Sequence, residues 1–438
     1  MKRNLTAAVR FAFIFFLLSA IMLPAFTLGA SASSEQMPST DDAPIVYVYN
    51  IENSVPIIEK NSMNIISTGA STKIMTGLVA IDILGNRLDE KITVTERMLS
   101  KSSGRARGFK AGEIVTVRQM LYATICGGYN DAACILAYTA ADSYDDFVGM
   151  MNKKASELGA KNTKYLNVTG LNETGMYTTA VDIAVIARAA FENRIFLEIC
   201  NTDRYTMEPT NLSEARLIPN RNSLVSNYYY TAYYNRYANG LCVGADNDGF
   251  GIITVARKNN LTYICVFMQT DNEETAYKLA NNIINWVLDS FGYLKLLDGE
   301  GEICKIKVSM SDKKSEISVV PANEITIYMS LGIDTDNGIS YSYSLDSDTI
   351  NAPVQKGQKC GFITVTDKEN GTILATVDLV TAEDAEQGGM LRVLSAIGAY
   401  TSSRAFRATL VFLAVFSIIF FTVRYINKKR NRRRKNYF

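Results

Sequence analysis

Histidine is absent from this chain, and its seven cysteines show none of the Cys-x-x-Cys spacing typical of metal sites. A zinc site would therefore need several thiols to converge, and nothing in their scattered positions predicts this. We expect no metal site and assign no cofactor. Because the cysteine count is odd, at least one thiol is unpaired or joined to another chain, and we expect free, buried thiols. The seven are Cys126, Cys134, Cys200, Cys242, Cys265, Cys304 and Cys360.

Charge is missing from two long apolar runs, one near each end of the chain. The first, Phe11 to Leu28, follows three basic residues and leads to the small residues Ala30-Ser31-Ala32. This pattern predicts a secretory signal peptide over residues 1–32. Residues 33–44 are expected to be a linker, and most of the chain is expected to be exported.

The second uncharged run, residues 408–423, lies between Arg407 and Arg424. It is slightly shorter than the roughly 20 residues that a bilayer requires, but flanking arginines can snorkel to the interface. We predict a transmembrane helix over 406–424 and, by the positive-inside rule, a basic cytoplasmic tail over 425–438. Before it, residues 389–404 predict an amphipathic segment on the membrane surface. The alternative is a buried core helix followed by a nucleic-acid-binding tail, and the export signal argues against it.

The net charge of +1 hides an uneven distribution along the chain. Without the three basic residues of the leader and the nine from Arg407 onward, 33 basic and 44 acidic residues remain, a charge of −11. A negatively charged exported part is a poor nucleic-acid binder, so we expect no nucleic-acid partner. The basic tail is expected to hold anionic lipid head groups at the inner leaflet.

Two hydrophobic periods divide the exported part. From residue 45 to 292 strand and helix patterns mix, which predicts an α+β domain, and from 300 to 383 apolar residues alternate, which predicts a small all-β domain. Local signals support this: a capping box at Thr116 and Gln119, and turns at Asn259-Asn260 and Asn370-Gly371. The first domain is expected to contain a hairpin at 44–61, helices at 144–158, 179–192 and 273–290, and two adjacent strands within 249–268.

The stretch ISTGASTKIMTGLVAID, residues 65–81, is similar to the start of an active-site helix from which one group is missing. A serine hydrolase of the Ser-x-x-Lys type places its serine three residues before the lysine, and three residues before Lys73 stands Ala70. The lysine begins an amphipathic pattern with one buried face, carried by Ile74, Met75, Leu78, Val79 and Ile81.

Four segments carry a wider resemblance: GASTKIMTGLVAID, GFKAGEIVTVRQMLYATICGGYNDAACILAY, the run from FVGMMNKK to ARAAFEN, and PVQKGQKCGFITV. Together they resemble the serine-type D-alanyl-D-alanine carboxypeptidases, the low-molecular-weight penicillin-binding proteins, over residues 42–383. The resemblance implies a transpeptidase domain like those of penicillin-binding proteins and β-lactamases over 45–292, followed by a β-rich domain and a C-terminal transmembrane helix. It also implies an extracytoplasmic location and trimming of peptidoglycan stem peptides.

The catalytic motifs that the resemblance implies are degraded in this chain. The Ser-x-x-Lys motif keeps Lys73 but has Ala70 in place of the nucleophile, and Ser-x-Asn keeps Asn130 but has Gly128 in place of its serine. The strand that should read Lys-Thr-Gly, and bind the substrate carboxylate, reads Cys242, Val243 and Gly244. A thiol cannot replace an ammonium group there.

Several alternatives remain open for these residues. Ser71 is a candidate nucleophile, but two residues before Lys73 its hydroxyl would face away from the ammonium group unless the helix is distorted. Lys73 can persist for structure alone, packing its stem and bonding Asn130. Cys242 can be a small buried hydrophobe, a reactive thiol with a pKa lowered by Lys73, or half of a disulfide with Cys126.

The segment NYYYTAYYNRYANG, residues 227–240, is rich in tyrosine. It is expected either to pack as ordinary strand and loop or to form a sugar- or partner-binding surface.

The sequence as a whole predicts a membrane-anchored homologue of the carboxypeptidases that is a pseudoenzyme. Its expected partners are peptidoglycan stem peptides or cell-wall proteins. The alternative is an active serine carboxypeptidase that uses Ser71.

Overall fold

The computed structural model describes residues 36–435, and the expected signal peptide lies outside them. The chain divides into two compact units. The first takes residues up to Gly292 together with Tyr328–Ile333, and the second takes Tyr293–Ile327 and the residues from Asp334 onward. Each unit is described by itself.

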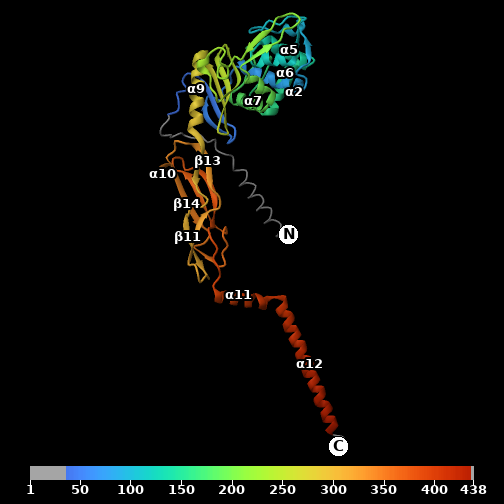
Figure 1. The fold of residues 1–438 in the computed structure, drawn as a ribbon, viewed down its shortest axis with the longest axis vertical. Coiled ribbons are helices and arrows are strands. Elements are labelled where there is room, and N and C mark those ends of the chain that lie inside the picture. The colour runs from blue at the N-terminus through green and yellow to red at the C-terminus, as the bar shows by residue number, and fades with distance from the viewer. Residues whose placement is uncertain (1–35, 436–438) are drawn as a thin grey trace, which may run out of the picture. The chain divides into compact units, whose positions relative to one another are not determined.

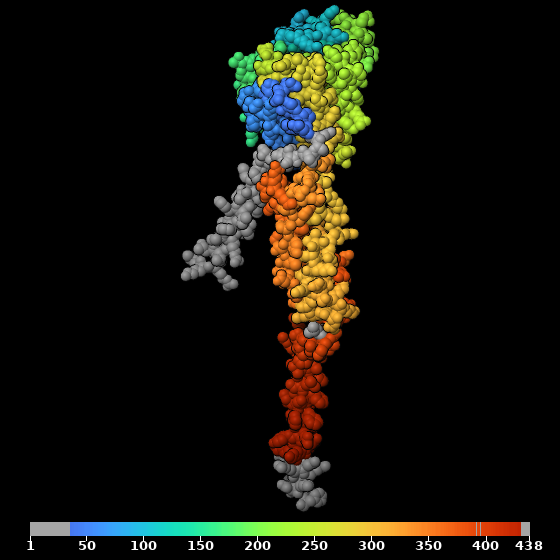
Figure 2. Space-filling view, turned by 90° about the vertical axis from the view of Figure 1, so that its left-hand side faces the viewer, coloured from blue at the N-terminus to red at the C-terminus, as the bar shows by residue number. Residues whose placement is uncertain are grey.

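The first unit is built on a five-stranded antiparallel sheet with the order β2-β1-β9-β8-β7 (Figure 1). The strands are β1 (Ile45–Asn50), β2 (Val55–Lys60), β7 (Ala238–Asp246), β8 (Gly249–Lys258) and β9 (Leu261–Thr270). The predicted hairpin at 44–61 is confirmed as β1 and β2, and the two adjacent strands as β8 and β9. In Figure 2 the blue hairpin lies against the yellow segment that contains β9, its ladder partner.

Helices cover both faces of this sheet. Successive side chains of a strand point to opposite faces, and in β1 both sets are apolar, so each face packs against helices. Ile45 and Tyr47 face one core with most of the helices, whereas Val46 and Val48 face a second core with α9 (Glu273–Ser290). The helices on the same side as Ile45 and Tyr47 are α2 (Thr72–Leu84), α3 (Glu96–Leu99), α4 (Val117–Ile125), α5 (Asn130–Ala140), α6 (Tyr144–Leu158), α7 (Ala180–Glu192) and α8 (Arg194–Cys200).

The predicted helices are confirmed as α6, α7 and α9, and the capping box at Thr116 and Gln119 begins α4. Two small two-stranded antiparallel sheets and two 3-10 turns also belong to the first unit. They are β3 (Lys91–Thr93) with β4 (Ile114–Thr116), β5 (Arg204–Met207) with β6 (Arg216–Pro219), η1 (Gly69–Ser71) and η2 (Thr231–Tyr233).

The prediction that the helix of Lys73 has a single buried face is wrong. Helix α2 packs against α4, α5, α6, α7 and α8, so it is buried on nearly every side and only Asp82 is well exposed. A helix in the centre of a bundle has apolar residues all round, and the apolar spacing along one face did not show this.

The second unit contains a six-stranded sheet with the order β14-β16-β17-β12-β11-β15 and its own small core. Its strands are β11 (Cys304–Ser309), β12 (Glu316–Pro321), β14 (Ile339–Leu345), β15 (Thr349–Asn351), β16 (Lys359–Asp367) and β17 (Ile373–Thr381). The single turn α10 (Thr335–Gly338) also belongs to this unit, whereas the strands β10 (Phe291–Leu297) and β13 (Ile325–Ser330), which pair with one another, are each divided between the two units. The predicted hairpin with Asn370-Gly371 is confirmed by the pairing of β16 with β17.

Two helices follow the β-rich part of the chain. Helix α11 (Gly389–Ser402) covers most of the expected amphipathic segment, and α12 (Arg404–Lys435) covers the expected span and most of the basic tail. Within the described residues, Arg404–Arg430 is the one stretch that is long and apolar enough to cross a membrane. The last residues of the tail, 436–438, lie outside the described part.

Candidate active site

The turn that carries Ala70 is fixed by its neighbour Gly69. Gly69 has a φ of +44°, which side chains disfavour, and the carboxylate of Asp246 on β7 leaves no room for a Cβ atom there. The turn therefore presses against β7 and leads directly into α2. This arrangement places the Ala70 methyl group against the strand.

Ser71 belongs to the same 3-10 turn, and its hydroxyl is turned away from Lys73. Its Oγ donates a hydrogen bond to the carbonyl of Thr68, one turn back, and the residue is only 3% exposed. A hydroxyl in this position has its proton engaged and no access for a substrate.

Lys73 reaches across to the loop after α6 rather than to Asn130. Its Nζ donates a 2.6 Å hydrogen bond to the carbonyl oxygen of Thr169, in a turn closed by N–H bonds from Thr169 (3.2 Å) and Gly170 (2.8 Å) to Asn167 Oδ1. The expected bond between Lys73 and Asn130 is therefore wrong. Because burial disfavours the charged ammonium group, its pKa is lowered to about 8; among the weaker effects, Cys242 opposes the shift and Arg221 adds to it.

Asn130 is the first residue of α5 and holds the loop in front of it. Its Nδ2 donates a 2.6 Å hydrogen bond to the carbonyl of Ser103, while its Oδ1 is buried and has no partner among the described residues. Two residues earlier, Gly128 has a φ of +68°, and a Cβ atom there would meet nothing closer than Arg221 Cδ at 3.9 Å. A serine would therefore fit the space at Gly128 but would strain its backbone.

The strand β7 brings Cys242 and Gly244 against Ala70. Cys242 Sγ donates to the carbonyl of Ala70 at 2.9 Å, and a Cβ atom on Gly244 would lie 2.7 Å from the Ala70 Cβ. Val243, between them, points to the other face of the sheet and belongs to the core under α9. The structure thus brings Ala70, Cys242 and Gly244 together and turns Val243 away from them.

Two of the three alternatives for Cys242 are wrong, and the third, a small buried side chain, agrees with the structure. Burial raises the pKa of its thiol to about 11, although Lys73 and Arg221 oppose the shift, so the thiol is not activated. It also forms no disulfide with Cys126, whose Sγ donates to the carbonyl of Ile199 at 2.8 Å. The expectation of free thiols is confirmed, since all seven are free and only Cys304 is not buried.

The sequence interpretation missed Arg221 and Arg105, two further cations whose charges act on Lys73. The Nη1 of Arg221 lies 3.1 Å from where a Cβ on Gly244 would be, so the guanidinium group lies between the second and third motif positions. Arg105 is held by a 2.9 Å hydrogen bond from its Nε to the carbonyl of Gly127. Within residues 36–435, none of these three cations has an ion pair. The sequence signal for Arg221 is that it is the one charged residue between Leu217 and Asn235.

On the other side of Ala70 the space is nearly closed. The gap beside Ala70, Gly244 and Met268 holds about 10 Å³, roughly the room for one water molecule. The carboxylate of Asp246 borders this gap, and burial raises its pKa, while a hydrogen bond from Ser67 opposes the shift. The described residues contain no cluster of three acidic, cysteine or histidine side chains that could hold a metal ion.

Comparison with known proteins agrees with this arrangement. Residues 42–272 match the family described as D-alanyl-D-alanine carboxypeptidase, and residues 291–387 match the C-terminal domain of penicillin-binding protein 5. The D-alanyl-D-alanine carboxypeptidase DacF of Bacillus subtilis is 27% identical over 386 residues, covering 86% of this chain and 95% of that protein. DacC of Escherichia coli is 24% identical over 397 residues, covering 88% of this chain and 92% of its own length.

A solved structure has the same fold. Penicillin-binding protein 5 from Haemophilus influenzae superposes with a TM-score of 0.57 at 20% identity, covering 81% of this chain and all of that one. The α+β domain, the β-rich domain after it and the two family matches therefore agree with the predicted fold class. This chain belongs to the D-alanyl-D-alanine carboxypeptidase family.

Proposed function

We propose that this protein is a membrane-anchored, extracytoplasmic pseudoenzyme that binds peptidoglycan stem peptides without cleaving them. The observation that carries the proposal is the methyl group of Ala70 where the family's nucleophile is expected. A methyl group cannot attack a peptide carbonyl or be acylated by a penicillin, and loss of a catalytic serine costs about a millionfold in turnover.

The groups around Ala70 support the loss of chemistry. The Nζ of Lys73 has no hydroxyl three residues away to deprotonate and donates to Thr169 instead. Ser71, the alternative nucleophile, is buried and donates to Thr68, and the thiol of Cys242 is protonated at neutral pH. An active carboxypeptidase that uses Ser71 would need to move this hydroxyl out of the turn.

The cations of the cleft support retained binding. Lys73, Arg105 and Arg221 gather without an acidic partner among the described residues, and such a cluster attracts an anion. A peptide that ends in a free carboxylate supplies one, and the planar guanidinium of Arg221 can form a bidentate pair with it. Arg221 would thus supply the positive charge that Cys242 does not.

The membrane anchor is part of the proposal. The helix from Arg404 to Arg430 has the length and composition to span a bilayer, and its basic end would lie in the cytoplasm. In α11 the exposed apolar residues recur at helical spacing, which suits a helix lying on the membrane surface. They are Met390, Val393, Leu394, Ile397 and Tyr400. With the expected signal peptide, this arrangement would hold both units outside the membrane.

Two measurements on the full chain in detergent micelles test the proposal. Intact-protein mass spectrometry after incubation with a penicillin should show no adduct, and calorimetric titration with a peptide ending in D-alanyl-D-alanine should show saturable binding. Release of D-alanine or a penicillin adduct that disappears in Ser71→Ala would establish the active alternative. Absence of peptide binding would refute the binding function and favour a cell-wall protein as partner.

The Ala70→Ser variant is the matched control for the chemistry. An adduct on this variant alone would mean that the nucleophile is the group whose absence prevents acylation. No adduct on either protein would mean that Gly128 and Cys242 also prevent it.

A further inference from the structure

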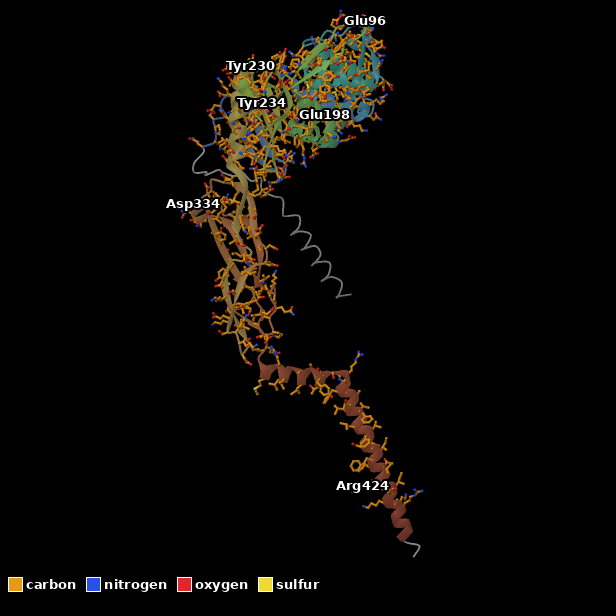
Figure 3. All side chains as sticks on the ribbon, viewed as in Figure 1. Glu96, Glu198, Tyr230, Tyr234, Asp334 and Arg424 are labelled. Atoms are coloured by element: carbon orange, nitrogen blue, oxygen red, sulfur yellow. The ribbon has the colours of Figure 1, made fainter. Side chains whose placement is uncertain are left out.

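A cluster of exposed tyrosines lies on the segment that connects Arg221 to β7. Tyr228, Tyr229, Tyr230 and Tyr234, which we call the tyrosine platform, are 44%, 44%, 50% and 48% exposed. Figure 3 shows Tyr230 and Tyr234 near one another at the edge of the first unit. From Asn222 to Asn235 the chain contains no charged residue. Four half-exposed rings within seven residues favour the second of the two expectations for this segment, a sugar- or partner-binding surface.

The platform is held firmly by the residues on its two sides. Asn235 Nδ2 donates to Asn281 Oδ1 (2.9 Å) and Asn285 Oδ1 (3.1 Å) on α9, and Asn281 Nδ2 donates back to the carbonyl of Tyr233 (2.9 Å). The ring of Tyr233 stacks on buried Tyr277, with 5.0 Å between centroids and 14° between planes. The backbone that carries the exposed rings is therefore fixed before any ligand arrives.

The other end of the platform is fixed by Asp203. Its carboxylate accepts hydrogen bonds from Ser226 Oγ (2.6 Å) and the N–H of Asn227 (3.2 Å). The next residue, Tyr228, packs edge-on against Tyr229, with 5.0 Å between ring centroids, and lies under the guanidinium of Arg204. Tyr228 and Tyr229 thus limit each other's rotation, and Tyr230 packs edge-on against Tyr233 with 5.7 Å between ring centroids.

The exposed hydroxyls of the platform are unused. None of its four Oη atoms has a hydrogen-bond partner among residues 36–435, so each side chain offers an apolar ring face and a free donor and acceptor. Rigid tyrosines give a large amphipathic contact area at little entropic cost. The ligand that matches such a surface has flat apolar faces edged with hydroxyl groups.

We infer that the tyrosine platform binds an uncharged polysaccharide whose pyranose rings carry equatorial substituents, so that their C–H faces stack on the tyrosines. Residues 222–235 carry no charge, and the guanidinium group of Arg204 over Tyr228 is already paired with Asp203 at 2.7 Å, which together match a neutral ligand. Because the four exposed rings are separate contacts spread from Tyr228 to Tyr234, the ligand that uses them all is a chain of several sugars. Because the backbone is already ordered, binding needs little rearrangement.

The test is a calorimetric titration of the full chain in micelles with the β-1,4-linked hexamer of N-acetylglucosamine, beside the monomer. The hexamer should bind at least tenfold more tightly than the monomer, since it can contact several rings. Changing Tyr230 to Ser should weaken hexamer binding about three- to tenfold, and changing all four platform tyrosines to Ser should abolish it. Tyr230→Phe, which keeps the ring, should retain most of the affinity.

Two controls keep the outcome specific. Tyr343→Ser removes an equally exposed tyrosine on β14 and should leave hexamer binding unchanged. Arg221→Gln, in the cleft, should also leave it unchanged, so that failure here is separate from failure of stem-peptide binding. No hexamer binding, or binding that persists in the four-tyrosine variant, would overturn the inference; in the first case a protein partner becomes the explanation of the platform.

Discussion

Replacing Lys73 by methionine separates a structural role of this lysine from a binding role. The pKa of Lys73 is lowered from 10.5 to about 8, so holding its charge costs the folded protein about 3 kcal/mol at neutral pH. Methionine keeps the aliphatic stem and removes this cost. It also removes the hydrogen bond to the Thr169 carbonyl, whose loss costs about 1–2 kcal/mol. Lys73→Met should therefore stabilise the protein by about 1–2 kcal/mol at pH 7.

The difference in unfolding free energy between Lys73→Met and the wild type changes with pH in a definite direction. The unfolded lysine binds its proton up to about pH 10.5 and the folded one only up to about pH 8, so the wild-type protein gains stability as pH rises between these values. Methionine lacks this gain. By pH 10 the wild type should have gained about 2–3 kcal/mol, which exceeds the advantage of about 1–2 kcal/mol that the variant has at pH 7, so the variant should become the less stable protein.

Urea unfolding of both proteins at pH 7 and pH 10 measures this difference, and other titrating groups cancel between the two proteins. Fluorescence of Trp286 reports on the first unit alone, because it is the single tryptophan of the chain and lies buried in α9. A Lys73→Met variant that is less stable by the same amount at both pH values would refute the reasoning. It would mean that Lys73 persists for structure.

Three further changes test particular contacts. Arg221→Gln should weaken binding of a peptide with a free carboxylate about 10- to 100-fold in a calorimetric titration, because a charge-assisted hydrogen bond contributes about 1.5–3 kcal/mol. An unchanged Kd would exclude Arg221 from the anion site. Gly69→Ala should destabilise the first unit by about 2–4 kcal/mol in urea unfolding, since a φ of +44° and the Asp246 carboxylate both oppose a Cβ, and a loss below 1 kcal/mol would contradict this. Glu113→Gln should lower the free energy of unfolding by about 3–5 kcal/mol in the same assay, because it leaves the buried guanidinium of Arg216, 2.8 Å away, without its charge partner. A change near zero would mean that the pair is not desolvated.

The secondary structure could be predicted where its signals are local. Thr116 and Gln119 lie three residues apart and cap each other's backbone, and Asn259-Asn260 both have the positive φ that a tight hairpin turn requires. Each signal acts within one turn of chain, so tertiary contacts do not change its meaning. The position of Lys73 in the first turn of α2, three residues after Ala70, followed from the same kind of spacing.

The contacts of the site could not be predicted because they depend on distant segments. The acceptor for Lys73 is the Thr169 carbonyl, 96 residues along the chain, and no spacing rule connects the two. One alternative for Cys242 was an acidic thiol, because a cation is near, but burial is the larger effect and raises the pKa of the thiol instead. Arg221 escaped notice because it lies in no motif and is brought to Gly244 only by the fold.

The charged groups kept in the cleft lower the stability of the folded protein, and this calls for an explanation that the missing groups do not need. The missing ones are the hydroxyls and the lysine of the third motif, which the proposed loss of catalysis explains. The cations that remain, Lys73, Arg105 and Arg221, repel one another and lack acidic partners in the described chain, so keeping them lowers stability. A cleft with no ligand would be more stable without them, as Lys73→Met is designed to measure. If that variant is more stable yet binds the peptide less tightly below pH 8, the charge is present for an anionic ligand.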